Sequence, residues 1–424
     1  MADTQASETQ KGWRRYFAMP RNVIALSVVS LLNDTSSEII YPLLPAFLFL
    51  ALGASPFAIG VIEGFAESVA SLLKLFSGYI SDRFGTRKLL VFIGYALAAI
   101  TRPFLAFAGT WPQVLTVRLT DRVGKGIRGA PRDALIAGSV PKKDRGFAFG
   151  FNRAADHFGA VLGPIAAFLL LMIFAVDPQN PTLREYQQVF LFASVPVVIG
   201  LLIVGIFVRE NAKKPAAPTE PAPPPLKLSL HGFDGNFKRY LVIVAIFTLS
   251  NSTDAFLLLR ATQVGISPAV LPLLWMTLHF SKVVFSLLGG GLSDRFGRKG
   301  VIVSGWIVYA LVYCGFAFVT SAWQCWALFI VYGAYFGLTE GAEKAFVADM
   351  VPEGKRGTAY GLFNLAIGIT VFPASLLFGL LWTEFNEVTA FLLSAGVSIV
   401  AVVLLTTIHT KYDHEDSEAQ TRTQ

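Results

Sequence analysis

The stretch SDRFGTRK at residues 81–88 stands directly after a long apolar run, and a shorter copy, SDRFGRK, occupies residues 293–299 in the same setting. The two copies begin 212 residues apart, which is half the length of the 424-residue chain. A second match is longer, because residues 126–151 align without gaps with residues 337–362. These repeats indicate that the chain contains two copies of one module.

The composition indicates that both modules lie in a membrane. Of all residues, 54% are hydrophobic and only 15% are charged, whereas a soluble domain carries about 25% charged residues. The charges are concentrated in short stretches between long apolar runs, which is typical of a polytopic membrane protein. The two cysteines, Cys314 and Cys325, lie in apolar runs without the spacing of a zinc site. The net charge of +7 does not predict nucleic-acid binding, because the sequence contains no soluble basic domain.

Long apolar runs predict the number of membrane-spanning helices. A helix needs about 20 mainly apolar residues to cross a bilayer. Twelve runs of that size lie near residues 23–50, 57–80, 89–108, 113–137, 147–176, 187–208, 238–260, 267–291, 300–319, 322–348, 358–382 and 385–408. The predicted fold class is therefore an all-α polytopic membrane protein with twelve transmembrane helices in two six-helix bundles that repeat each other.

A proline-rich stretch, NAKKPAAPTEPAPPPLK at 211–227, separates the two sets of six helices and cannot form a packed core. The predicted domains are a cytoplasmic tail at 1–22, a bundle at 23–208, a cytoplasmic linker at 209–237, a second bundle at 238–408 and a cytoplasmic tail at 409–424. Lys and Arg gather in the loops on the side of the N-terminus, which predicts that both termini are cytoplasmic. We expect a multi-pass protein of the bacterial inner (plasma) membrane.

Three motifs carry a resemblance to a known family. GYISDRFGTRK at 78–88 looks like the loop signature Gly-x-x-x-Asp-Arg-x-Gly-Arg-Arg, and GGLSDRFGRK at 290–299 looks like its degenerate second copy. Arg118 stands where the family has an arginine in its fourth helix. With these motifs the chain resembles the major facilitator superfamily of secondary transporters over essentially its whole length. The resemblance implies two bundles around a central cavity that opens alternately to each side of the membrane.

The fifth helix carries a further motif of this family. GAVLGP, with Gly159, Gly163 and Pro164, is similar to the Gly-x-x-x-Gly-Pro motif that is common among family antiporters. The family usually continues with two glycines after two more residues, whereas Ala167 and Phe168 stand there in this chain. The motif therefore favours an antiporter, and the departure from it weakens that interpretation.

The repeated loop is expected to act as a cytoplasmic gate between the bundles. An anion at Asp82 can dock against the positive N-terminus of a helix in the other half, for which the helix that starts near Arg356 is the family's partner. In the alternative interpretation, the basic residues of the loop only set the topology. The predicted gate residues are Gly78, Asp82, Arg83, Gly85, Arg87, Gly290, Asp294, Arg295, Gly297 and Arg298.

Many charged residues lie inside the predicted spans, where a charge is costly and should face the protein interior or a water-filled path. Five cations share one face of the fourth helix, namely Arg118, Arg122, Lys125, Arg128 and Arg132. The first half contains nearly equal numbers of acidic and basic residues inside its spans, which predicts that most of these residues form structural pairs. The basic fourth and fifth helices would pair with the acidic first and second helices. The predicted proton or substrate pathway consists of Asp34, Glu38, Glu63, Glu67, Arg118, Asp121, Arg122, Arg153, Asp156, His157, Asn251 and Asp254.

The leading functional prediction is a proton-coupled transporter that exports a small organic solute by alternating access, with a mid-membrane carboxylate such as Asp34 exchanging the proton. An alternative is transport of an anionic solute or of a carboxylate-rich, siderophore-like metal chelate bound by the fourth helix. A second alternative is a divalent metal ion such as iron, for which acidic side chains and His157 or His279 would be ligands.

Several further expectations concern partners and energy. No nucleotide-binding motif is present, so we expect neither ATP coupling nor an enzyme. A proton or other ion gradient would supply the energy, and no cofactor or resident metal is expected. The expected partners are the small-molecule or ion substrate and the lipid bilayer, without nucleic acid, and we expect a monomer.

Overall fold

The computed structural model describes residues 19–84, 86–141, 144–210, 229–352 and 355–408, and the side chains at 79, 82–84 and 287–296 lie outside this description. Within these ranges the chain is helical, and no strand is present. Nine of the helical segments there are long and apolar enough to cross a bilayer, and Leu271–Ser286 adds a shorter apolar one. The fold is therefore the all-α membrane fold that the sequence predicts.

The first bundle contains six spans, several of which are built from more than one helical piece. They are α2 (Arg21–Ile40) with η1 (Tyr41–Leu43), α3 (Leu44–Ala46) and η2 (Phe47–Ala51), then α4 (Pro56–Phe84), α5 (Arg87–Thr101) with η3 (Arg102–Phe107), α6 (Trp111–Gly138), α7 (Arg145–Phe174) and α8 (Leu183–Phe207). Here α2 packs mainly against α7 and α8, and α6 packs between α4 and α5.

The second bundle repeats this plan. It contains α9 (Gly235–Ser250) with α10 (Ala255–Gln263), α11 (Leu271–Phe296), α12 (Arg298–Phe318), α13 (Ala322–Met350), α14 (Arg356–Glu384) and α15 (Glu387–Thr406). In the described residues the twelve spans agree with the twelve predicted runs, and no end differs by more than five residues. The predicted linker and terminal tails fall largely on residues outside this description, so those domain limits stay predictions.

The first span of each bundle is interrupted, and the two interruptions meet. Pro42 is the second residue of η1, where a residue without a backbone N–H cannot continue the regular helix. In the second bundle, α9 ends at Ser250 and residues 251–254 are not helical before α10 begins. The hydroxyl of Tyr41 lies 3.4 Å from the hydroxyl of Thr253. The interruptions therefore place polar groups of both bundles side by side.

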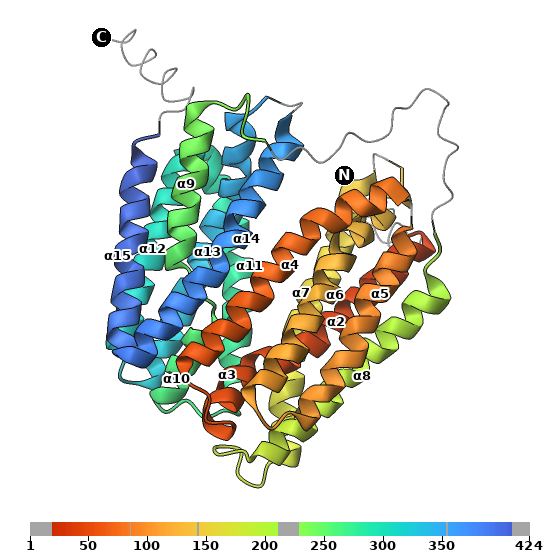
Figure 1. Ribbon diagram of the computed structural model, residues 1–424, viewed down its shortest axis with the longest axis vertical. Coiled ribbons are helices and arrows are strands. Elements are labelled where there is room, and N and C mark those ends of the chain that lie inside the picture. The colour runs from red at the N-terminus through yellow and green to blue at the C-terminus, as the bar shows by residue number, and fades with distance from the viewer. Residues whose placement is uncertain (1–18, 85, 142–143, 211–228, 353–354, 409–424) are drawn as a thin grey trace, which may run out of the picture.

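The bundles touch along a limited seam. Helix α4 packs closely on α14, where the Ser68 hydroxyl donates to the Gly368 carbonyl at 2.6 Å and the backbone N–H of Phe57 donates to the Thr383 hydroxyl at 3.0 Å. The bundles lean together at the end formed by α3 and α10 and diverge toward the end where the labels N and C lie (Figure 1). Between them lies a cavity of about 700 Å³.

Candidate functional site

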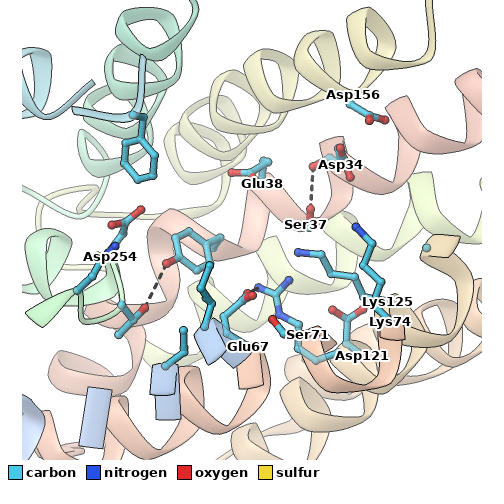
Figure 2. Close-up of a pocket in the computed structure, with 18 of the residues that line it drawn as sticks. Asp34, Ser37, Glu38, Glu67, Ser71, Lys74, Asp121, Lys125, Asp156 and Asp254 are labelled. Carbon is cyan, nitrogen blue, oxygen red and sulfur yellow. Dashed lines mark hydrogen bonds and ion pairs between the residues drawn. The ribbon is translucent and has the colours of Figure 1, made fainter. Parts of the chain in front are cut away.

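The cavity between the bundles is rich in charged side chains. Its lining includes the acidic residues Asp34, Glu38, Glu67, Asp121, Asp156, Asp254 and Glu343, and the basic residues Lys74, Arg102, Arg118, Arg122, Lys125, Arg128, Arg132 and Arg153. The first bundle contributes all of the bases, while the second adds two acids and several aromatic rings. Figure 2 shows that Asp34 and Glu38 lie on one wall and Asp254 on the opposite side.

The pair Arg118–Glu63 is buried. The Nε and Nη2 atoms of Arg118 donate to the two carboxylate oxygens of Glu63 at 2.8 and 2.6 Å, and both side chains are at most 5% exposed. Such a bidentate pair satisfies both partners and joins α6 to α4. Arg118 lines the cavity and Glu63 does not, so the geometry favours a structural role for this pair, and the pathway role of the two residues stays a prediction.

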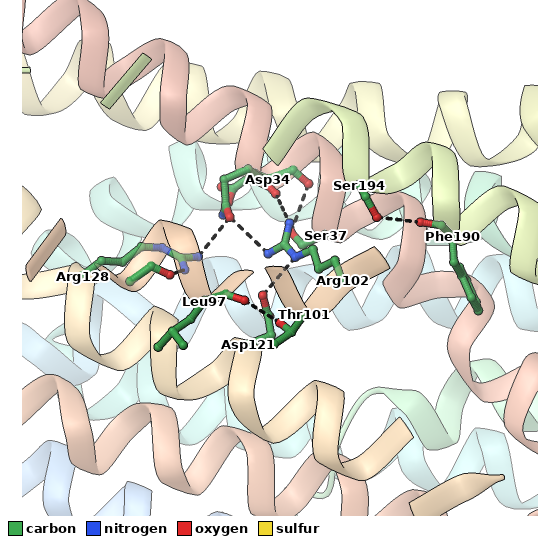
Figure 3. A network of polar contacts seen from close by, with 11 residues as sticks. Asp34, Ser37, Leu97, Thr101, Arg102, Asp121, Arg128, Phe190 and Ser194 are labelled. Carbon is green, nitrogen blue, oxygen red and sulfur yellow. Dashed lines mark hydrogen bonds and ion pairs between the residues drawn. The ribbon is translucent and has the colours of Figure 1, made fainter. Parts of the chain in front are cut away.

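A second buried network centres on Asn33, and its guanidinium groups are shown in Figure 3. Arg102 donates to the Asp121 carboxylate at 3.0 Å, to the Asn33 carbonyl at 3.0 Å and to the Asn33 side chain at 3.1 Å. Arg128 donates to the same Asn33 side chain at 3.1 Å and to the Gly94 carbonyl at 3.1 Å. Asp121 is thus held inside the bundle. The sequence-based pathway omitted Arg102, although an arginine inside an apolar run is itself a signal.

Two further arginines of α6 also pair within the first bundle. Arg122 lies 2.9 Å from Glu67, whose side chain is 38% exposed toward the cavity. Arg132 donates to the Ser30 hydroxyl at 2.8 Å and lies 3.8 Å from Asp156. The pairs between α4 and α6 agree with the expected pairing of the fourth with the second helix.

The two carboxylates of α2 differ from the others. The side-chain amide of Asn33 donates to Asp34 at 3.0 Å, and no Arg or Lys nitrogen of the described residues lies within 4.0 Å of the Asp34 carboxylate. Glu38 instead crosses the boundary between the bundles. It accepts a hydrogen bond from Trp275 Nε1 at 2.7 Å, and His279 Nε2 lies 3.6 Å away.

The helix-5 motif explains how α2 is positioned. A Cβ atom added at Gly159 would lie 3.1 Å from the Cβ of Asp34, and one added at Gly163 would lie 2.5 Å from the Cβ of Glu38. The two glycines of α7 therefore allow α2 to approach closely at the two residues that carry its carboxylates. Pro164 lies within α7 directly after the second of these glycines.

The second bundle contributes a smaller polar cluster at its interrupted span. Tyr332 donates to Asp254 at 2.7 Å, and the Lys282 ammonium lies 4.0 Å from the same carboxylate. Asn251 donates to the Tyr335 hydroxyl at 3.0 Å. Glu343, which the predicted pathway does not contain, lines the cavity and accepts a hydrogen bond from Trp306 Nε1 at 2.9 Å. Asn251, Asp254 and Glu343 thus line the cavity, and Lys282 lies beside Asp254.

Two of the predicted pathway residues have exposed side chains. Arg153 lines the cavity and reaches Glu340 of the second bundle at 3.8 Å, and the two side chains are 62% and 53% exposed. His157 is exposed and is not among the residues that line the cavity. Its place in the pathway stays a prediction.

The predicted gate is described only in part. Gly85, the side chains of Asp82, Arg83, Asp294 and Arg295, and the surroundings of Gly290 lie outside the described residues, so the inter-bundle contact stays a prediction. Gly78 faces Ala130 within its own bundle. Gly297 has a φ of 76°, a conformation that favours glycine, and Arg298 pairs with Asp349 of its own bundle. Arg87 begins α5, and the expected partner helix α14 begins at Arg356.

A metal site is not evident in the described part of the chain. No group of three or more His, Cys, Asp or Glu side chains there is arranged to hold an ion. The acidic residues proposed as ligands in the metal alternative, Asp34, Glu38, Glu63 and Glu67, are held instead by the Asn33 amide, Trp275, Arg118 and Arg122.

Comparisons with known proteins agree with this architecture. The family model of the Major Facilitator Superfamily matches residues 26–260 and 239–423. An uncharacterised MFS-type transporter of Methanocaldococcus jannaschii is 34% identical over 91% of this chain and 94% of its own. The proton-coupled antiporter flippase LtaA of Staphylococcus epidermidis is 22% identical over 81% and 82% of the two chains. The crystal structure of a variant of the nucleoside transporter NupG has a TM-score of 0.77 at 15% identity, covering 92% of this chain and all of that chain.

Proposed function

Because this chain belongs to the Major Facilitator Superfamily of transporters, we propose that it couples the movement of protons to the export of a small organic solute. The solute would bind in the central cavity, and the cavity would open alternately to the two sides of the membrane. In this proposal the protein is a monomer in the inner (plasma) membrane with both termini in the cytoplasm, and an ion gradient supplies the energy.

The observation that carries the proposal is the contact of Glu38 across the boundary between the bundles. Trp275 and His279 of α11 hold this carboxylate at 2.7 and 3.6 Å, although it belongs to α2 of the other bundle. These contacts must break when α2 and α11 separate. A carboxylate that loses such partners inside a membrane is stabilised by taking up a proton, because an isolated charge there is costly. Proton binding at Glu38 would therefore be linked to the conformation of the transporter.

Asp34 supports the same function from one helical turn away. It lines the cavity, accepts only the Asn33 amide within hydrogen-bond distance, and lacks a cation within 4.0 Å among the described residues. Of the α6 arginines, Arg118, Arg122 and Arg132 pair with other carboxylates and Arg128 bonds to Asn33 and Gly94, so Asp34 is not held permanently as one half of an ion pair. A carboxylate in this setting is suited to binding and releasing a proton.

Two observations support the direction. The bundles diverge at the end where α2 begins and α15 ends (Figure 1). If the termini are cytoplasmic, a solute would load from the cytoplasm in this conformation. The glycines of the helix-5 motif contact α2 at Asp34 and Glu38, and a similar motif is common among antiporters of the family. LtaA, named a proton-coupled antiporter, supports proton coupling by its similarity to the chain.

The test is a transport assay in a host that lacks the chain. Solutes and metal ions inside and outside the cells are profiled by mass spectrometry, with and without a protonophore, for the parent chain and for Asp34→Asn and Glu38→Gln. We expect one organic solute to accumulate outside, only with both carboxylates and only with the proton gradient. Asp177→Asn, in the loop between α7 and α8, is the matched control and should behave like the parent.

The proposal fails if export is the same in both carboxylate variants and in the presence of the protonophore. A uniporter or an exchanger would then be the better description. A divalent metal ion as the moving species would instead favour the metal alternative, and the same profiles report it directly.

A further inference from the structure

Apart from Arg153, which lies 3.8 Å from Glu340 of the second bundle, the basic residues of the cavity fall into two groups. The arginines Arg102, Arg118, Arg122 and Arg132 each have a carboxylate within 4.0 Å. Arg128 is buried and bonds to the Asn33 side chain and to the Gly94 carbonyl. These five are committed to the interior of the first bundle, so the arginine stripe of α6 is not free to bind a solute.

Lys74 and Lys125 form the other group. Both side chains are exposed and line the cavity, and no carboxylate oxygen of the described chain lies within 4.0 Å of either ammonium. Among the charges that act on Lys125 are Glu67, which already pairs with Arg122 at 2.9 Å, and Asp34. Among the described residues of the cavity wall, these two lysines therefore have the ammonium groups without a carboxylate within 4.0 Å and are available to a ligand.

The two lysines emerge from one place on the wall. Lys74 comes from α4 and Lys125 from α6, and these helices pack against each other. A Cβ atom added at Gly129 would lie 3.7 Å from the aliphatic stem of Lys74, and Gly129 lies one helical turn after Lys125. In Figure 2 both lysine side chains extend into the open space below Asp34. The absence of a side chain at Gly129 leaves room for the Lys74 stem beside Lys125.

The second bundle contributes apolar side chains to the cavity. Phe336 of α13 and Ile367 and Val371 of α14 line it and are partly exposed, and Asp254 and Glu343 of the same bundle also line it. A cavity of about 700 Å³ is in the range of sites for drug-sized molecules, which combine apolar walls with a few placed polar groups. The cavity thus offers two cations from the first bundle and apolar surface from the second.

We propose that the transported solute is an organic anion, whose carboxylate or other acidic group binds Lys74 and Lys125 while its apolar body contacts Phe336, Ile367 and Val371. This inference rests on the proposed function only in taking the cavity as the transport path. It names the substrate class, and it moves the anion site from the arginines of α6 to the two lysines.

The test is equilibrium binding to the full chain in lipid nanodiscs, without any gradient, measured by calorimetry. Three probes share one apolar body and differ in charge, namely 2-naphthoate, 2-naphthylmethanol and 2-naphthylmethylamine. We expect 2-naphthoate to bind tightest. Lys74→Gln and Lys125→Gln should each weaken its binding about tenfold, because each removes one charge-assisted contact. Lys125→Arg should retain most of the affinity, which separates loss of charge from loss of folding.

Lys238→Gln, on the exposed side of α9, is the matched control and should bind 2-naphthoate like the parent. The inference is overturned if 2-naphthoate shows no saturable binding, if the amine or the alcohol binds as tightly, or if both lysine variants keep the parental affinity. If the affinity for 2-naphthoate depends on the two lysines but export does not depend on the proton gradient, the anion site is supported and only the proposed proton coupling is contradicted.

Discussion

Trp275 Nε1 donates a 2.7 Å hydrogen bond to Glu38 Oε2, and this bond joins the first span of one bundle to the second span of the other. The two residues are 237 positions apart in the sequence. The same carboxylate oxygen lies 3.6 Å from His279, one turn further along α11. The Glu38 carboxylate therefore keeps both partners only while the two bundles are in contact at this position.

Glu38→Gln should separate proton coupling from solute movement. The amide oxygen can still accept the Trp275 hydrogen bond, but the charge that attracts His279 and binds the proton is lost. We expect gradient-driven export to fall at least about tenfold, equivalent to about 1.4 kcal/mol, while solute exchange without a gradient continues. Parallel measurements of both rates in proteoliposomes check this. Equal loss of the two rates would show that Glu38 serves binding or folding instead.

Glu63→Gln should destabilise the protein strongly. It leaves the buried Arg118 guanidinium without its bidentate carboxylate, and breaking one side of a buried pair costs about 3–5 kcal/mol. Unfolding of the purified protein by heat or by denaturing detergent measures the loss. The paired change Glu63→Leu with Arg118→Met removes both charges and should recover most of the stability. A single variant as stable as the parent would contradict the structural role given to this pair.

Gly163→Ala should push α2 away from α7. Its methyl group would lie 2.5 Å from the Cβ of Glu38 and 2.8 Å from the Thr35 carbonyl, so the helices must separate. Overpacking of this kind costs about 1–3 kcal/mol, and export should fall with it because Glu38 moves. Thermal unfolding and export are measured together.

Gly150→Ala is the control for that change, because it lies on the same helix and has no heavy atom within 4 Å of an added Cβ. It should leave stability unchanged or raise it slightly, since alanine favours a helix over glycine. Equal effects of the two alanines would mean that loss of helix flexibility, and not close packing on α2, explains the result.

Arg153→Gln should have a small effect. Its pair with Glu340 crosses the two bundles, but the atoms are 3.8 Å apart and both side chains are more than half exposed. Exposed pairs contribute about 0–1 kcal/mol and weaken as salt is added. We expect a change in unfolding free energy below about 1 kcal/mol, shrinking further in 0.5 M salt. A large loss of unfolding free energy that does not depend on salt would show that Arg153 makes a stronger interaction than its pair with Glu340.

Much of the candidate site follows from the sequence because a charge inside an apolar run must face the protein interior. That rule places Asp34, Glu38, Glu67 and Asp254 at the cavity in advance. It does not decide whether His157, which is exposed and outside the lining of the cavity, belongs to the pathway, because the rule identifies a costly residue and not the direction in which its helix turns it. It also gives no reason to prefer Glu343, whose importance depends on Trp306 of a neighbouring helix.

The sequence by itself determined the twelve spans, the two repeated bundles and the residues that bring charge into the membrane, because hydropathy and repetition are local properties of the chain. Only the tertiary structure decided which charges neutralise one another. Helix rotation and depth set the pairs Arg118–Glu63, Arg122–Glu67 and Arg102–Asp121. The same geometry leaves Lys74 and Lys125 facing the cavity. Each of these three ion pairs requires side chains from two different helices to meet within a few ångströms, and the spacing of residues along the chain does not determine whether they do.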